Sequence, residues 1–250
     1  MITVHDLLAA LQEKAPFETA EAWDNSGLSV GSEQSTVTKA VVALDVTEAA
    51  LQYAVAEHAD VFITHHPLIF NPLTSLSSES LVYRLAASGI AALSAHTNLD
   101  KAVGGVNDCL AEQLGLHAVY TAPDGISRIG TLQSALSAAA FAEYAAQCLH
   151  SPVRVRGGTG PVRTVALCGG GAADLVLPLL QTADAALTGE VKHHEWLAVP
   201  AAKTLVDGGH YATEIAVIPR LCTWLQESFP TLPVLPFYGE PPYQTLVLKG

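Results

Sequence analysis

The sequence predicts an α/β protein made of two similar halves. Short apolar runs alternate with helix-like segments along the chain, and the second half repeats the order of the first. Hydrophobic residues make up 50% of the 250 residues and charged residues only 14%, which suits a well-buried α/β protein and excludes a disordered chain. Strands and helices that alternate with short links form βαβ units, so we expect parallel sheets.

The first half begins with an amphipathic helix, Val4–Lys14, for which Thr3 and Asp6 provide a capping box. The Gly-containing segment 22–31 predicts turns. Continuous apolar runs then predict strands that are buried on both faces. These strands are expected at Val37–Leu44, Val61–Thr64 and Ile90–Ala95, with linking helices at Glu48–His58 and from Ser77 to Gly89.

The second half follows a further helix, Val103–Gly115. A segment at Ile126–Leu132 opens it, and an Ala-rich helix ends at Ser151-Pro152. A helix is expected from Thr213 to Phe229, with its start delayed or kinked by Pro219. Strands are expected at Val162–Leu167, Asp184–Thr188, Thr204–Asp207 and Thr245–Lys249.

The two halves also repeat in detail. The runs that end at Thr64 and Thr188 are each followed by a histidine pair, and later by a histidine with a carboxylate four residues on. We interpret this pattern as a degenerate duplication. Residues 1–125 then form one α/β subdomain, completed by about 215–250, and residues 126–214 form the other. Their strand ends would share a cleft, where open α/β sheets usually bind ligands.

Charge and cysteine content exclude several classes of protein. The net charge of −12 argues against a nucleic-acid-binding surface, with a short basic strip at Arg154, Arg156 and Arg163 as the local exception. The four cysteines lie far apart and predict reduced core residues. Neither a signal peptide nor a membrane span is predicted, so we expect a cytoplasmic protein.

Three segments carry histidines where strand-like runs end. In Asp60–Pro67 the apolar run is followed by the adjacent pair His65-His66, and the other two segments contain His96 with Asp100 and His210 with Glu214. Imidazole and carboxylate groups together suit first-row divalent metals, and a site without cysteine favours catalysis over a closed structural zinc. Asp100 and Glu214 are the natural bridging ligands, because a carboxylate offers two oxygens.

Four motifs in this order resemble those of the NIF3-like, or GTP cyclohydrolase 1 type 2 homolog, family. They are Trp23-Asp24-Asn25-x-Gly27-Leu28-x-Val30-Gly31, Thr64-His65-His66-Pro67, His96-Thr97-Asn98-Leu99-Asp100 and Gly209-His210-Tyr211-Ala212-Thr213-Glu214. The resemblance runs from about residue 3 to the end of the chain. It implies a NIF3-like fold of two intertwined, three-layer α/β subdomains with a dinuclear metal centre in the cleft between them.

The same resemblance implies the ligands and the assembly. The metal ligands map to His65, His66, Asp100, His210 and Glu214, and they would hold two divalent cations per chain, drawn from Zn, Fe, Mn, Ni or Mg. Family members are usually toroidal homohexamers. This chain matches the short, bacterial-type form, which has no inserted domain.

Several nearby residues have open roles. His96 is either a ligand, or a residue that orients Asp100 or the bound water, or a general acid–base. His193 and His194, with Glu190, are spaced like a second ligand set, although a cleft wall or substrate contact is the alternative. A histidine of this pair is also the alternative to His96 as the general acid–base. Asp45 either faces the cleft or caps a helix. The Gly169–Gly171 turn resembles a phosphate-binding loop, with a plain tight turn as the alternative. The segment Trp23-Asp24-Asn25 is interpreted as structural packing.

Two functions are consistent with these residues. The first is a metal-dependent hydrolase that acts on a small molecule, possibly a nucleotide, in which two cations activate water and polarise the substrate. The second is a non-catalytic, metal-binding oligomeric scaffold. An open coordination position would distinguish them, because catalytic metals keep a water ligand.

Overall fold

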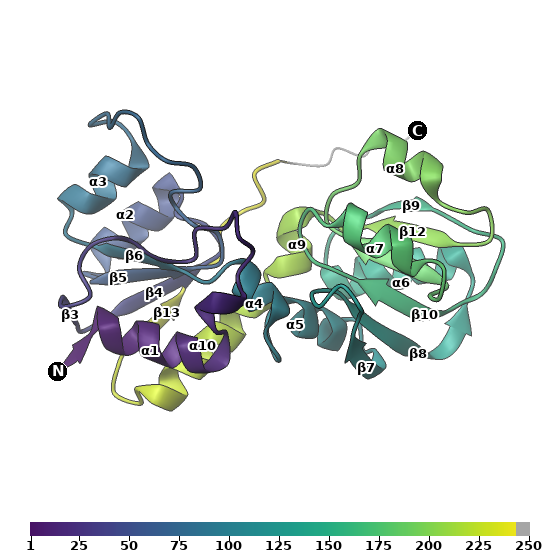
Figure 1. Ribbon diagram of the computed structural model, residues 1–250, viewed down its shortest axis with the longest axis horizontal. Helices are drawn as coiled ribbons and strands as arrows, with labels where there is room; N and C mark the ends of the chain where they lie inside the picture. The colour runs from purple at the N-terminus through teal and green to yellow at the C-terminus, as the bar shows by residue number, and fades with distance from the viewer. Residues whose placement is uncertain (244–250) are drawn as a thin grey trace. The chain divides into compact units, whose positions relative to one another are not determined.

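The computed structural model describes residues 1–243, and these divide into two compact units. The first unit comprises residues 1–105 and 217–239, and the second comprises residues 106–216 with the described residues from 240 onward (Figure 1). The division falls at Gly105, earlier in the chain than the expected boundary at residue 125. The strand expected at Thr245–Lys249 lies outside the described residues.

The first unit contains a five-stranded sheet in the order β13-β4-β5-β6-β2. The three central strands are fully buried and parallel, as expected, and β2 pairs with β6 in the antiparallel direction. The strands are β13 (Val234–Pro236), β4 (Ala40–Ala43), β5 (Val61–Thr64), β6 (Ala91–Ser94) and β2 (Gly27–Val30), and a separate pair joins β1 (Ile2–Thr3) to β3 (Thr36–Val37).

Helices cover both faces of this sheet and make the unit three-layered (Figure 1). On one face, α2 (Glu48–Ala56) and α3 (Leu81–Ala87) pack through Leu51 and Leu85 against Phe62. On the other, α10 (Val217–Ser228) contacts β4 and β13 and packs beside α1 (Val4–Lys14). A 3₁₀ turn, η1 (Phe17–Thr19), contacts the short helix α4 (Thr97–Lys101).

The second unit contains a six-stranded sheet in the order β7-β8-β10-β11-β12-β9. Strands β10, β11 and β12 are parallel, whereas β8 and β9 pair with them in the antiparallel direction. The bounds are β7 (His117–Thr121), β8 (Arg128–Leu136), β9 (Arg154–Arg156), β10 (Val162–Leu167), β11 (Ala185–Thr188) and β12 (Thr204–Asp207).

Side chains that alternate along these strands form two cores. Leu187 and Val206 pack with α5 (Val106–Gln113) and α6 (Ala138–Leu149). Ala186 and Leu205 pack with α7 (Ala173–Leu179) and α8 (His193–Ala198). Because neighbouring side chains of a strand point to opposite faces, the second unit also has three layers. The α/β, three-layer fold is therefore confirmed, and α5 belongs to the second unit because it packs on this sheet.

Two local expectations are corrected. The segment expected to form turns contains β2, an edge strand that is only half-buried and therefore lacks a continuous apolar run. The single helix expected from Thr213 to Phe229 is divided into α9 (His210–Glu214) and α10, so that its two parts fall in different units. Pro219 lies in the first turn of α10, where its missing N–H is not needed.

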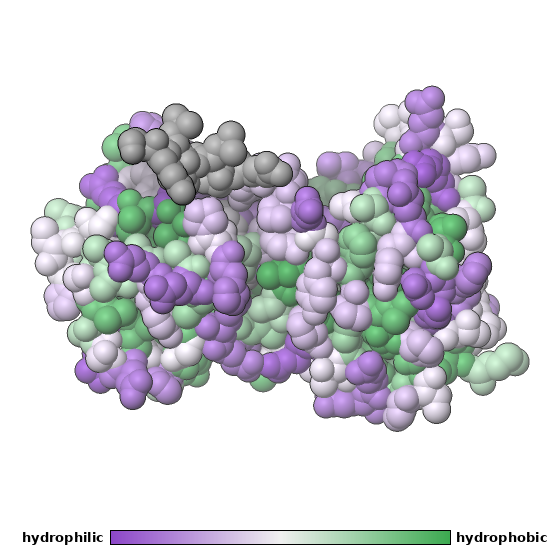
Figure 2. All heavy atoms as spheres, turned by 180° about the vertical axis from the view of Figure 1, so that it is seen from behind, coloured by the Kyte–Doolittle hydropathy of each residue, from purple (hydrophilic) through white to green (hydrophobic). Residues whose placement is uncertain are grey.

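The surface carries both polar and apolar residues. In the face drawn in Figure 2, hydrophilic residues border smaller hydrophobic areas. Among the described residues, none of the helices combines the length and apolar character needed to span a membrane.

Candidate metal centre

His65 follows β5 and is completely buried. Its Nδ1 lies 3.1 Å from the carbonyl oxygen of Ala95. Because a carbonyl oxygen can only accept, Nδ1 carries the proton and donates it, and Nε2 of the neutral ring keeps its lone pair. This is the form in which histidine binds a metal.

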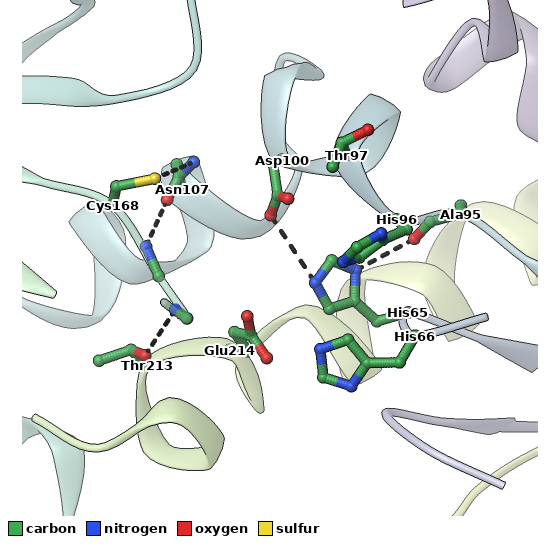
Figure 3. A network of polar contacts seen from close by, with 12 residues as sticks. His65, His66, Ala95, His96, Thr97, Asp100, Asn107, Cys168, Thr213 and Glu214 are labelled. Atoms are coloured by element: carbon green, nitrogen blue, oxygen red, sulfur yellow. Dashed lines mark hydrogen bonds and ion pairs between the residues drawn. The ribbon is translucent and has the colours of Figure 1, made fainter. Parts of the chain in front are cut away.

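Two further histidines of the first unit are held in the same way. Nδ1 of His66 lies 2.9 Å from Oδ1 of Asp45, and Nδ1 of His96 lies 2.8 Å from Oδ1 of Asp24. The three rings lie together in Figure 3, and each offers a ring nitrogen within 4.8 Å of those of the other two. The first unit therefore presents three imidazoles as one possible ligand group.

Asp24 is the most strongly hydrogen-bonded carboxylate of this group. Its Oδ2 accepts from the backbone N of Thr97 at 3.0 Å, from the Thr97 hydroxyl at 2.5 Å and from the Ser26 hydroxyl at 2.9 Å. Burial alone would raise the pKa of Asp24, but hydrogen bonds from His96 and Thr97, together with the charge of His96, hold it well below its usual range. Asp24 therefore remains ionised and keeps His96 oriented.

Asp100 lies on α4, and its Oδ1 is 3.7 Å from Nε2 of His65 (Figure 3). In the neutral His65 tautomer set by Ala95, both of these atoms are lone-pair donors. Two donors that face each other are favourable when a cation lies between them. This pair therefore fits a divalent metal, and Asp100 is a suitable anionic ligand for it.

The second unit holds a complementary pair on α9. Nε2 of His210 lies 3.2 Å from Oε2 of Glu214, and Nδ1 of His210 lies 2.9 Å from Oε1 of Glu190. The spacing of four residues places the two side chains on one face of the short helix. Glu214 is only 5% exposed, and a buried carboxylate requires a cationic or hydrogen-bonding partner. The donor chemistry of this pair also fits a metal.

The Gly169–Gly171 turn makes room for this pair. Gly170 has a φ of +63°, and a Cβ at this position would collide with the carboxylate of Glu214. The nitrogen of Gly170 donates to the hydroxyl of Thr213, and its carbonyl accepts from Gly189. The turn is therefore packed against α9. Steric crowding by Glu214 explains why a glycine occupies position 170, which the spacing of the glycines in the sequence did not reveal.

The structure also places the residues whose roles were left open. His193 and His194 lie exposed at the start of α8, and neither belongs to a possible ligand group among residues 1–243. Thr47, rather than Asp45, caps α2, since its side chain accepts from Ala50. Sequence reasoning did not identify Asp24, Asp45 and Glu190 as carboxylates that hold histidines. The spacing carries no signal for them, because they lie 20 to 72 residues from their partners.

A cavity of about 420 Å³ lies in the second unit. Its lining includes Glu190, Arg154, Asp207 and Tyr243. Arg154 forms an ion pair with the buried Asp207 and lies over the ring of Trp196, 5.7 Å from its centroid. The basic strip expected from the sequence is thus partly neutralised by an acidic residue, which makes it a weaker surface for phosphate groups.

Comparison with known proteins adds independent observations. The family model described as Duf34/NIF3 (NGG1p interacting factor 3) matches residues 2–238. Among curated relatives, the GTP cyclohydrolase 1 type 2 homolog of Lactococcus lactis is 32% identical and is matched over 83% of this chain and 86% of its own. The protein of the same name from Streptomyces coelicolor is 33% identical, over 86% and 82% of the two chains.

Solved structures agree with these relatives. Protein SA1388 of Staphylococcus aureus superposes with a TM-score of 0.89 at 27% identity, over 98% of this chain and 99% of the other. TTHA1606 of Thermus thermophilus superposes with a TM-score of 0.82 at 26% identity, over 97% and 100%. These matches cover both units.

Proposed function

Because this chain belongs to the Duf34/NIF3 family, we propose that it is a metal-dependent hydrolase that acts on a small molecule, with nucleotides as the first class to test. The proposed ligands are His65, His66, Asp100, His210 and Glu214, which would together hold two divalent cations. The name GTP cyclohydrolase 1 type 2 homolog, carried by two relatives, supports hydrolysis as the reaction class. The cytoplasm remains the predicted compartment.

The observation that carries this proposal is the common orientation of the histidines. Four rings each use Nδ1 to bind an oxygen, from Ala95 or from one of three carboxylates, so that Nε2 carries the lone pair that a cation binds. Carboxylate–histidine pairs of this kind fix the tautomer and raise the basicity of metal ligands. The predominance of imidazole favours zinc, iron or nickel over manganese or magnesium.

When bound, the cations would supply Lewis acidity to a water molecule and to a carbonyl or phosphoryl oxygen of the substrate. The protein itself would supply a proton carrier. His96 is oriented by the ionised Asp24 and lies outside the five proposed ligands, so its Nε2 is suited to accept and return a proton. Asp24 would act through His96, by fixing its tautomer, rather than on the substrate.

The test begins with the metal content. Protein purified without chelator should contain up to two divalent ions per chain by elemental analysis, and the His65→Ala/His66→Ala double variant should lose most of them. Turnover of a panel of nucleotides, phosphoesters and cyclic amides should then follow metal occupancy. A loaded protein that hydrolyses none of these, yet retains a partner that the metal-free form loses, would support the scaffold function instead.

His96 has its own experiment. In the proposed role, His96→Ala lowers turnover while at least one metal remains bound. Loss of both metals from this variant would instead make His96 a ligand and extend the ligand set.

We also propose a homohexamer, on the family resemblance alone. Light scattering should give a mass near six times that of one chain at micromolar concentration. A monomer under these conditions would contradict the proposal.

A further inference from the structure

Two large aromatic side chains of the first unit are exposed beside the histidines. Trp23 precedes β2 and is 60% exposed, and Phe70 follows β5 and is 49% exposed. Their ring centroids are 5.8 Å apart, with an angle of 48° between the planes. The side chain of Asn25 donates to the carbonyl of Ile69 at 2.5 Å and thus joins the two loops. The pair is therefore a defined arrangement of two connected segments.

Both rings contact His96. The centroid of Trp23 lies 6.0 Å and that of Phe70 lies 6.1 Å from the His96 ring, at interplanar angles of 72° and 75°. His96 in turn lies 5.2 Å from His65 and 5.6 Å from His66. The aromatic pair is therefore only one ring away from the proposed metal ligands.

The orientation of the pair leaves aromatic surface available. The two planes are tilted, so neither ring covers the face of the other, and both meet His96 at a steep angle. Tryptophan and phenylalanine usually bury much of their area, and aromatic side chains beside a few polar groups commonly line small-molecule sites. Trp23 is also held in place, since the adjacent Asp24 is bound to His96 and Thr97.

We propose that Trp23 and Phe70 bind a planar aromatic or heteroaromatic ring of the substrate and place its edge at His96. A flat ring can stack on such side chains through its π face, whatever its polar substituents. The alternative occupant is a second copy of the chain. Leu73 and Leu76 of the same loop are exposed as well and suit a protein contact, but a ring bound at Trp23 lies next to His96. The inference rests on the proposed function, because it concerns the substrate of the same site.

The test measures ring binding separately from catalysis. Guanosine 5′-monophosphate, pterin and nicotinamide represent three ring classes, and ribose 5-phosphate is a matched probe without a ring. At least one ring should bind and quench tryptophan fluorescence, while ribose 5-phosphate should bind at least about tenfold more weakly. Calorimetry with chelator-treated protein should still detect ring binding, so this result stands even if hydrolysis is never observed.

Variants locate the binding. Trp23→Ala should weaken ring binding about tenfold or more, Trp23→Phe should weaken it less, and Phe70→Leu should have an intermediate effect. Tyr120→Ala, which removes a 57% exposed aromatic side chain from β7, is the control and should bind like wild type. Metal content should be equal in all four variants.

Several results would overturn the inference. These are wild-type affinity in Trp23→Ala, equal binding of ribose 5-phosphate, or no binding of any of the three rings to wild-type protein. A Trp23→Ala variant that binds the ring normally but has a smaller mass by light scattering would assign the pair to a contact between copies.

Discussion

The two units use similar parallel strands to present different donors. In the first unit, the ends of β5 and β6 carry three histidines, and all three rings belong to one possible ligand group. In the second unit, α9 carries one histidine and one buried glutamate. The first unit therefore offers its histidines together with Asp100, whose side chain is 17% exposed, while the second offers Glu214, whose side chain is only 5% exposed.

The two units share a feature of the segment that follows their third central parallel strand in chain order. Both β6 and β12 lead to a histidine at the start of a short helix, with a carboxylate four residues later. Each of these histidines, His96 and His210, binds a carboxylate through Nδ1. The carboxylates come from different places, because Asp24 precedes an antiparallel edge strand and Glu190 follows β11. The two units thus share the orientation of the histidine but not the residue that holds it.

We expect the largest effect on metal binding from removing the buried charge of Glu214. Glu214→Gln removes the anionic ligand of the second unit and should abolish most metal binding, measured by elemental analysis after dialysis. Glu195→Gln is the matched control, because Glu195 is also buried but binds the backbone of Lys192. Full metal content in Glu214→Gln would remove the distinction between the two units.

Gly170→Ala tests the steric part of the second site. The added Cβ should displace the Glu214 carboxylate and lower metal affinity by at least about tenfold. Gly125→Ala separates crowding from backbone strain, since Gly125 also has a positive φ of +78° but open space at the Cβ position. It should cost only about 1 kcal/mol in the free energy of unfolding and leave metal affinity unchanged. Equal metal affinity in the two variants would contradict the steric explanation.

Removal of a carboxylate that binds a histidine should lower metal affinity by a comparable amount in the two units. Asp45→Ala in the first and Glu190→Ala in the second should each lower metal affinity about 10–100-fold, because the ligand ring loses its fixed orientation. Titration with a chromophoric chelator measures this change. If only one variant loses affinity, the orienting role applies to that unit alone.

Asp24 makes the stability of the first unit depend on pH. In the folded protein its pKa lies below the ordinary 3.8, so the carboxylate stabilises the fold above about pH 4, and this stabilisation is lost as the pH falls further. Asp24→Asn should therefore lower the free energy of unfolding by about 1.5–3 kcal/mol at pH 7, and by less towards pH 3. Chemical denaturation at both pH values measures the difference, with the exposed Glu13→Gln as control. A deficit that is the same at pH 3 and pH 7 would contradict this cause.

The smallest expected effects concern the helix caps, one in each unit. The side chains of Thr47 and Ser137 accept from the backbone nitrogens of Ala50 and Ala140. Thr47→Ala and Ser137→Ala should each cost about 1 kcal/mol of unfolding free energy, and the double variant should show the sum, because the two caps share no partner. Calorimetry would reveal two transitions instead of one if the units unfold separately.

Much of the fold could be predicted from apolar runs. The six central strands of the two sheets, Thr3 as the cap of α1 and the α/β class agree with the structure, because strands buried on both faces leave a continuous hydrophobic signal. The edge strands β2, β7 and β9 were not predicted. They are short and partly exposed, so their sequences are not distinguishable from loops.

The candidate site was predictable to a different extent. The sequence by itself determined the chemical types of the ligands, since histidines and carboxylates follow the buried strands at recognisable spacings. Only the tertiary structure decided which oxygen holds each histidine, because Asp24 and His96 are 72 residues apart and meet where β2 pairs with β6. It also decided that a side chain at Gly170 would meet the Glu214 carboxylate and that Trp23 is exposed beside His96 rather than packed. Hydrogen-bond direction and steric exclusion depend on positions in space, and a linear pattern does not encode them.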